Sequence, residues 1–202
     1  MSEETAVEPE APIKPSRRDR LHMQNRRAAI WTVLYGFLGG FVFMVFSMIP
    51  TPFTMVSIIR FGFIPALAII GLVGAIRGPI AGLLTGYIGT ILADFILEGV
   101  IVTMTLPAFA YGVMGLIVGL ASYDLANGRS LAKLSILSVV GFVFAALLLV
   151  VIGLLVEGYA VLVGIAFVLL PNLTSGIPSV LLLTPVLGRI WQYLTQRTPA
   201  TT

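Results

Sequence analysis

The sequence contains no cysteine and a single histidine, His22. Without thiols the chain forms no disulfide and has no thiolate nucleophile, and one histidine excludes the usual His/Cys zinc sites. Charged residues make up only 10% of the 202 residues, whereas 58% are apolar. A soluble domain of this size has no use for so much apolar surface, because its core hides only about two thirds of the surface of the unfolded chain. The composition therefore indicates that lipid surrounds the chain.

Six apolar stretches are long enough, or nearly so, to cross a bilayer. A helix needs about 20 mostly apolar residues to span the hydrocarbon layer. We therefore predict an all-α integral membrane protein of about six transmembrane helices, at about residues 28–49, 54–76, 79–97, 105–123, 134–156 and 171–194. The apolar piece at about residues 159–170 is too short to span alone, and we expect it to be interfacial or re-entrant.

The two ends of the chain are polar. Residues 1–25 are rich in glutamate, proline and arginine, a composition typical of a disordered tail. The arginines at its end lead into a full-length apolar run, so we expect no cleaved signal peptide. The sequence thus predicts a cytoplasmic tail at residues 1–25, a six-helix transmembrane domain at residues 26–195 and a short cytoplasmic tail at residues 196–202.

Lysine and arginine predict the orientation. If the N-terminus is cytoplasmic, the six spans place eleven of the 12 cations on the cytoplasmic side and only Arg60 outside. We therefore expect both termini in the cytoplasm and the chain in the cell (inner) membrane as a multi-pass protein. Because the cations lie beside apolar runs, they indicate membrane orientation and no nucleic-acid partner.

Small residues recur at four-residue spacing in two spans, an arrangement that lets helices approach closely in lipid. The first span carries Ala28, Thr32, Gly36 and Gly40, and the third carries Gly78, Gly82, Gly86 and Thr90. Packing within the monomer explains both stripes. For the first-span stripe, docking of a partner protein is also open, and docking predicts that Gly36→Leu folds and binds its solute yet loses the partner.

Ionisable residues near the outer ends of the spans are candidates for a ligand site, because a charge within a membrane is costly and usually faces the bundle interior. Asp94 and Glu98 are four residues apart and share a helical face. Arg60 lies on the same side, where it forms a structural salt bridge with one of them or binds a ligand carboxylate or phosphate. Glu157 belongs to the outer loop before the last span, as a lid residue or as an ordinary solvated one.

The last span carries a polar face formed by Asn172, Ser175 and Ser179. Serines in helices often bond back to their own backbone, whereas an amide needs partners for two donors and one acceptor. We therefore predict Asn172 as a ligand contact, together with Arg60, Asp94, Glu98 and Glu157. For the mid-span Tyr87 and Tyr111, contact with a ligand and contact with a neighbouring helix both stay open.

Several short motifs follow one another in an order that is similar to a known family. They are the first-span stripe, Phe63-Ile64-Pro65-Ala66, the run Gly71-Leu72-Val73-Gly74-Ala75-Ile76-Arg77-Gly78-Pro79-Ile80-Ala81-Gly82 followed by Asp94, Pro171-Asn172-Leu173, and Leu183-Thr184-Pro185-Val186-Leu187. Over about residues 26–195 this order resembles the substrate-binding (S) component of energy-coupling factor (ECF) vitamin transporters. The stripe departs from the family pattern, which has alanines four residues apart.

The resemblance implies the high-affinity substrate-binding subunit of an ECF-type ABC importer for a vitamin or related micronutrient. Its partners would be a membrane coupling protein, docked on the first-span stripe, and two cytoplasmic ATPases. The chain itself has no GxxxxGK[ST] loop, so ATP chemistry would belong to those partners. No cofactor and no metal are expected. A cationic ring such as thiamine, a zwitterion and a neutral flavin all stay open as the solute.

Other classes of protein fit the sequence less well. Tyr123-Asp124 is typical of intramembrane aspartyl proteases, but that chemistry needs a second aspartate in the same site. Asp94 lies toward the opposite side of the membrane, so we predict no enzyme activity and no catalytic residue. A channel, a non-ECF transporter subunit or an assembly scaffold is the alternative to the transporter subunit.

Overall fold

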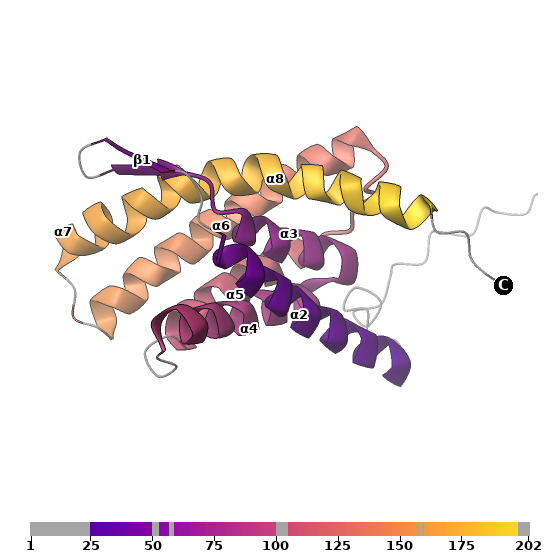
Figure 1. Cartoon of the computed structure of the whole chain (residues 1–202), viewed down its shortest axis with the longest axis horizontal. Coiled ribbons are helices and arrows are strands. Elements are labelled where there is room, and N and C mark those ends of the chain that lie inside the picture. Colours follow the sequence, from indigo (N-terminus) through magenta and orange to yellow (C-terminus); the bar gives the residue numbers. More distant parts are fainter. Residues whose placement is uncertain are drawn as a thin grey trace, which may run out of the picture.

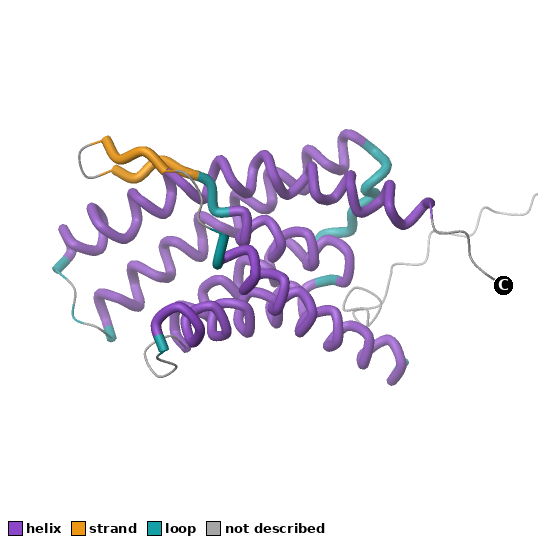
Figure 2. The backbone as a smooth tube through the Cα atoms, in the orientation of Figure 1, coloured by secondary structure: helices purple, strands orange, loops and turns teal. Residues whose placement is uncertain are grey.

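The computed structural model describes residues 25–49, 53–56, 59–99, 105–156, 158 and 160–197. Within them, a bundle of apolar helices carries one small β-hairpin at one end (Figures 1 and 2). The elements are α2 (Arg26–Ser47), β1 (Phe53–Val56), β2 (Ile59–Gly62), α3 (Pro65–Arg77), α4 (Pro79–Glu98), α5 (Thr105–Gly119), α6 (Gly128–Leu155), α7 (Val161–Val163), the π-helical turn η1 (Gly164–Leu169) and α8 (Leu170–Arg197).

Among the described residues, four helical segments are long and apolar enough to cross a membrane. They are Arg26–Ser47, Pro79–Leu97, Gly128–Leu155 and Val161–Gln196. The helices α3 and α5 are apolar but shorter, and the 13 residues of α3 rise only about 20 Å. The predicted all-α membrane fold is therefore confirmed, with two of its six apolar helices shorter than a bilayer is thick.

Glycine contacts hold α4 against α5. Gly82 and Gly115 face each other so closely that a Cβ atom on either would overlap the backbone of the other. One turn further along, Gly86 lies against the backbone of Tyr111. In lipid such contact is driven by van der Waals packing rather than by the hydrophobic effect. The stripe of the third span is thus a packing surface, as its sequence predicts.

The helix α2 packs on the other side of α4. Gly36 and Gly40 are buried against Leu84, Ile88 and Gly89, and the Thr85 hydroxyl donates a hydrogen bond of 3.3 Å to the Gly36 carbonyl. The opposite face of α2 is exposed and apolar, as a lipid-facing surface should be; it carries Leu34, Phe37, Leu38 and Phe41.

A second group of helices, α3, α6 and α8, completes the bundle. Phe142 of α6 is fully buried, and its ring lies so close to Gly176 of α8 that a Cβ atom there would overlap it. The start of α3 is fastened to α8, because the Ile64 N–H donates a 2.6 Å hydrogen bond to the Ser179 hydroxyl. The core therefore joins residues far apart in the chain.

The hairpin corrects the predicted second span. Residues 54–76 were expected to form one helix, but Phe53–Val56 and Ile59–Gly62 pair as antiparallel strands and α3 begins only at Pro65. Proline is well suited to the first turn of a helix, where its missing N–H has no partner to lose. The apolar run therefore divides at Pro65 into a hairpin and a short helix.

The expected interfacial or re-entrant segment at residues 159–170 is also wrong. The helix runs from Val161 to Gln196 without a break. Pro171 has no N–H to donate to the carbonyl four residues earlier, and its ring clashes with that carbonyl. The turn η1, immediately before it, is π-helical. A wider turn relieves this clash without ending the helix.

Candidate functional site

The two ends of the bundle differ in charge. One end, at the right in Figure 1, carries the start of α2 and the ends of α3 and α8, with Arg26, Arg77 and Arg189. We call it the arginine-rich end. The other end carries the hairpin, the end of α4 and the start of the α7–α8 helix. Under the positive-inside rule this second end faces outward, and Asp94, Asn172 and the backbone of Arg60 belong to it.

Two polar side chains meet there across α5 and α8. The Tyr111 hydroxyl donates a 3.3 Å hydrogen bond to the Asn172 Oδ1 atom, and Asn172 Nδ2 donates one of 2.8 Å to the Val168 carbonyl. An amide has two N–H donors and an oxygen with two lone pairs. Asn172 therefore keeps one donor and one acceptor position for a further partner.

Asp94 belongs to the same group. It is partly buried on α4, and its carboxylate lies close enough to Tyr111 to act on it electrostatically. The residues Asp94, Tyr111 and Asn172, which we call the polar cluster, thus come from three different helices. Of the predicted ligand residues, the structure brings Asp94 and Asn172 to one cluster, through a tyrosine that the sequence alone did not assign.

The other three predicted ligand residues are described less fully. The backbone of Arg60 lies in β2, opposite Met55, and β2 packs against α8. Glu98 is the last residue of α4, and Gly99 after it ends the helix with a φ of 71°. The side chains of Arg60 and Glu98, and all of Glu157, lie outside the described residues. Their role in ligand binding stays a prediction.

The serines of the last span have structural partners. The Ser175 hydroxyl donates to the Pro171 carbonyl at 2.7 Å, and the Ser179 hydroxyl donates to the Ser175 carbonyl at 2.6 Å. Ser179 also accepts the Ile64 N–H. These bonds confirm the expectation that the serines bond back to their own helix, and they leave Asn172 as the ligand candidate on this face.

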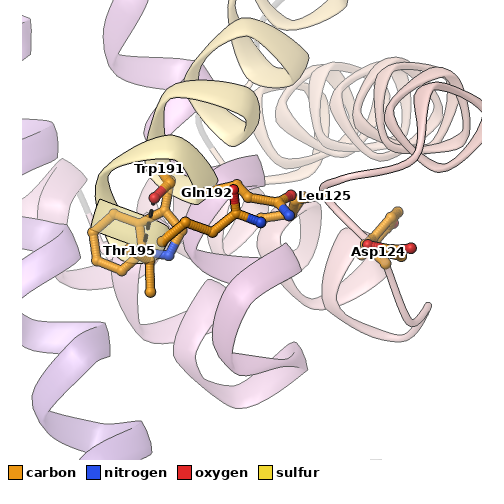
Figure 3. A pocket seen from close by; sticks show the side chains of 7 residues that line it. Asp124, Leu125, Trp191, Gln192 and Thr195 are labelled. Carbon is orange, nitrogen blue, oxygen red and sulfur yellow. Dashed lines mark hydrogen bonds between the residues drawn. The ribbon is translucent and has the colours of Figure 1, made fainter. Parts of the chain in front are cut away.

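A pocket of about 310 Å³ opens at the arginine-rich end instead. It lies between the α5–α6 connection and the last turns of α8 and is lined by Tyr123, Asp124, Leu125, Trp191, Gln192, Thr195 and Gln196 (Figure 3). Figure 3 shows Gln192 reaching from α8 toward Leu125, and its buried Oε1 atom has no hydrogen-bond partner. The pocket is shallow and lies far from the polar cluster, so we do not assign the solute to it.

Asp124 stabilises the turn in which it lies. Its Oδ1 atom accepts the Ala126 N–H at 3.0 Å, and Asn127 caps α6 by accepting the Arg129 N–H at 3.0 Å. Asp94 belongs to the opposite end of the bundle, so the two aspartates form no catalytic pair. Among the described residues, no group of three His, Cys, Asp or Glu side chains is arranged to hold a metal.

The first-span stripe lies inside the monomer. Thr32, Gly36 and Gly40 are buried, and the Thr32 hydroxyl donates a 2.9 Å hydrogen bond to the Ala28 carbonyl. Contact with α4 gives the stripe a packing role, which is one of the two interpretations that the sequence leaves open. Docking of a coupling protein by these residues stays a prediction.

Fold and polar cluster together define a multi-pass helical membrane protein with polar side chains between its helices. Residues 24–195 match the family of the ECF-type riboflavin transporter, S component, and the chain belongs to this family. The predicted resemblance is thereby confirmed, and the chain is a transporter subunit and not an enzyme. No curated protein and no solved structure matches the chain.

Proposed function

We propose that this chain captures riboflavin, or a close flavin relative, at the outward end of the bundle and hands it to a separate energising module. The family name supplies the solute class. The observation that supports the location is the hydrogen bond between Tyr111 and Asn172, beside Asp94. This bond joins polar groups of α5 and α8 within an apolar bundle, and Asp94 of α4 acts on Tyr111 electrostatically.

The chemistry of the polar cluster suits a flavin. The pyrimidine edge of the isoalloxazine ring offers an imide N–H donor next to carbonyl acceptors. The remaining donor and acceptor of the Asn172 amide match such an edge. The ring of Tyr111 offers a surface on which a flat heterocycle stacks, and Asp94 accepts from a ribityl hydroxyl. We assign Arg60 of the neighbouring hairpin a further contact.

The energising partners are part of the proposal. As a member of this family, the chain would deliver its solute by associating with a membrane coupling protein and two cytoplasmic ATPases. Pull-down of the tagged chain from native membranes in mild detergent tests this, because a channel or a scaffold requires no ATPase to co-purify. Recovery of the chain without any ATPase under conditions that preserve solute binding would contradict the partnership.

The first prediction concerns the site. We expect Asn172→Ala and Arg60→Ala each to weaken riboflavin binding at least tenfold, or about 1.4 kcal/mol, because a buried polar group of the ligand loses its partner. Flavin fluorescence during titration of the purified protein measures the affinity. Native mass spectrometry shows whether riboflavin, and not thiamine, is retained.

A control is available on the same helix face. Ser175→Ala removes a hydroxyl whose one hydrogen bond within the described part of the chain is to the Pro171 carbonyl, so the affinity of this variant should stay within about twofold of the wild type. Unchanged affinity in both the Asn172 and the Arg60 variants would place the solute elsewhere. Tight binding of thiamine with no binding of riboflavin would reject the flavin assignment and keep the transporter subunit.

A further inference from the structure

An aromatic and cationic group lies at the arginine-rich end, away from the polar cluster. Arg27, Trp31 and Tyr35 are spaced four residues apart on α2 and so share one face of that helix. The rings of Trp31 and Tyr35 lie 6.3 Å apart with their planes tilted by 54°. From α3, the guanidinium of Arg77 lies over the Tyr35 ring, 4.3 Å from its centroid.

Stacking leaves the edge of the Arg77 guanidinium available. A guanidinium donates its hydrogen bonds in its own plane, so an aromatic ring beneath it orients the donors without using them. Within the described part of the chain, no carboxylate forms an ion pair with Arg77, and the first turn of α2 and that of α4 contain no acidic residue. Among the residues that the structure describes, no anion therefore neutralises the charge of Arg77.

The surroundings add to the positive potential. Arg27 stands one turn before Trp31, and α4 begins at Pro79, two residues after Arg77, so the positive end of its dipole is near. Trp31 is 45% exposed, and the adjoining apolar face of α2 is exposed as well. In a membrane that face meets acyl chains. The group thus lies where lipid headgroups meet the arginine-rich end of the bundle.

We propose that Arg27, Trp31, Tyr35 and Arg77 bind the phosphate of one anionic phospholipid between α2 and α3. The Arg77 guanidinium donates to the phosphate oxygens from its position on Tyr35, Arg27 supplies a second cation, and Trp31 lies along the glycerol and upper acyl region. Basic groups between transmembrane helices are a recurrent binding site for acidic headgroups. The site does not depend on which solute the chain carries.

The chain contains two tryptophans, which makes a direct test possible. In full-length protein carrying Trp191→Phe, Trp31 is the only tryptophan. The protein is reconstituted into phosphatidylcholine vesicles with a minor fraction of phosphatidylglycerol, and either lipid carries bromine on its acyl chains as a short-range quencher. We expect phosphatidylglycerol near Trp31 to be enriched about fivefold over its share of the bilayer, as one arginine near the surface provides.

Variants distinguish a specific lipid-binding site from general attraction of anionic lipids to a basic surface. Arg77→Gln should abolish the enrichment, and Tyr35→Leu should reduce it strongly although every charge remains. Arg129→Gln removes one positive charge from the same end of the bundle at an exposed position and should leave the enrichment unchanged. Recovery of monodisperse protein in detergent on each preparation reports whether the variant is folded.

Three outcomes would overturn the proposal. Equal quenching by the two brominated lipids in the wild type would show that no anionic lipid is selected. Equal loss in Arg77→Gln and Arg129→Gln, with Tyr35→Leu unchanged, would reduce the effect to net charge. Displacement of the lipid by inorganic phosphate, but not by chloride at the same ionic strength, would make the site one for a free anion. Failure of riboflavin to bind would leave the lipid result standing.

Discussion

Gly36 offers the sharpest test of how this bundle is held together. A Cβ atom at Gly36 would lie 2.7 Å from the Leu84 Cβ atom and 3.3 Å from the Ala81 carbonyl oxygen. Carbon atoms pack best at about 3.5–4.0 Å, so the first added carbon already overlaps α4 by about 1 Å. Gly36→Leu therefore has to push α2 and α4 apart.

The cost follows from the contacts that would change. Overpacking costs about 1–3 kcal/mol, and loss of the hydrogen bond from Thr85 to the Gly36 carbonyl costs about 1 kcal/mol. Leucine regains up to about 1 kcal/mol through its higher helix propensity. The net loss is about 1–3 kcal/mol, a large fraction of the stability of an ordinary fold.

The assay compares two leucines. Gly128→Leu places the same side chain at the start of α6, where, among the described residues, no atom beyond its own turn and chain neighbours lies within 4 Å of the new Cβ. It serves as the matched control. Recovery of monodisperse protein after heating in detergent and riboflavin affinity are measured on the same preparations. We expect both to fall in Gly36→Leu and neither to fall in Gly128→Leu.

This expectation reverses what docking of a partner predicts for the same variant. If Gly36→Leu folds, binds riboflavin as the wild type does and fails only to co-purify with the coupling module, the packing argument is wrong and the stripe is a docking surface. If the variant retains all three properties, neither role belongs to Gly36.

Two further predictions concern topology and pH. A protease-accessible tag at Thr202 should stay protected in intact cells, because eleven of the 12 cations lie on the side of the termini; cleavage from outside would reverse the topology. Burial raises the pKa of Tyr123 well above its usual 10.0, so its contribution to stability is complete below about pH 10 and is lost as the pH rises further. The alkaline limb of thermal stability should therefore be flatter in Tyr123→Phe, and identical limbs would exclude Tyr123 as its source.

The sequence predicted the long spans well, because an apolar run of about 20 residues has few alternatives to a membrane helix. The sequence prediction failed where a β-hairpin and a helix have the same apolar composition. Apart from Thr54 and Arg60, the run after residue 53 is as apolar in the strands as in α3, and the division at Pro65 is visible only as a residue suited to a helix start. At Pro171 the error was the opposite one. The sequence predicts that a helix starts there, whereas in the structure a π-helical turn lies just before Pro171 and the helix continues past it.

Two of the three residues of the polar cluster, Asp94 and Asn172, were predicted from the sequence, and Tyr111 was not assigned. Cost arguments single out Asp94 and Asn172, because charges and amides are rare and expensive in lipid. They do not reveal partners, and Tyr111 gained its role only when α5 and α8 were seen to bring it to Asn172. A mid-span tyrosine satisfies its hydroxyl equally well on a ligand or on a helix, and no spacing in the chain separates the two cases.

The hydrogen bond between the start of α3 and α8 has a consequence for the order in which the bundle forms during synthesis. Ile64 and Ser179 are 115 residues apart, so the ribosome has completed most of the chain before the acceptor for the Ile64 N–H, just before α3, exists. A helix of 13 residues is too short to be held across a bilayer by its own hydropathy. The packed position of α3 against α8 is therefore complete only after α8 has been made.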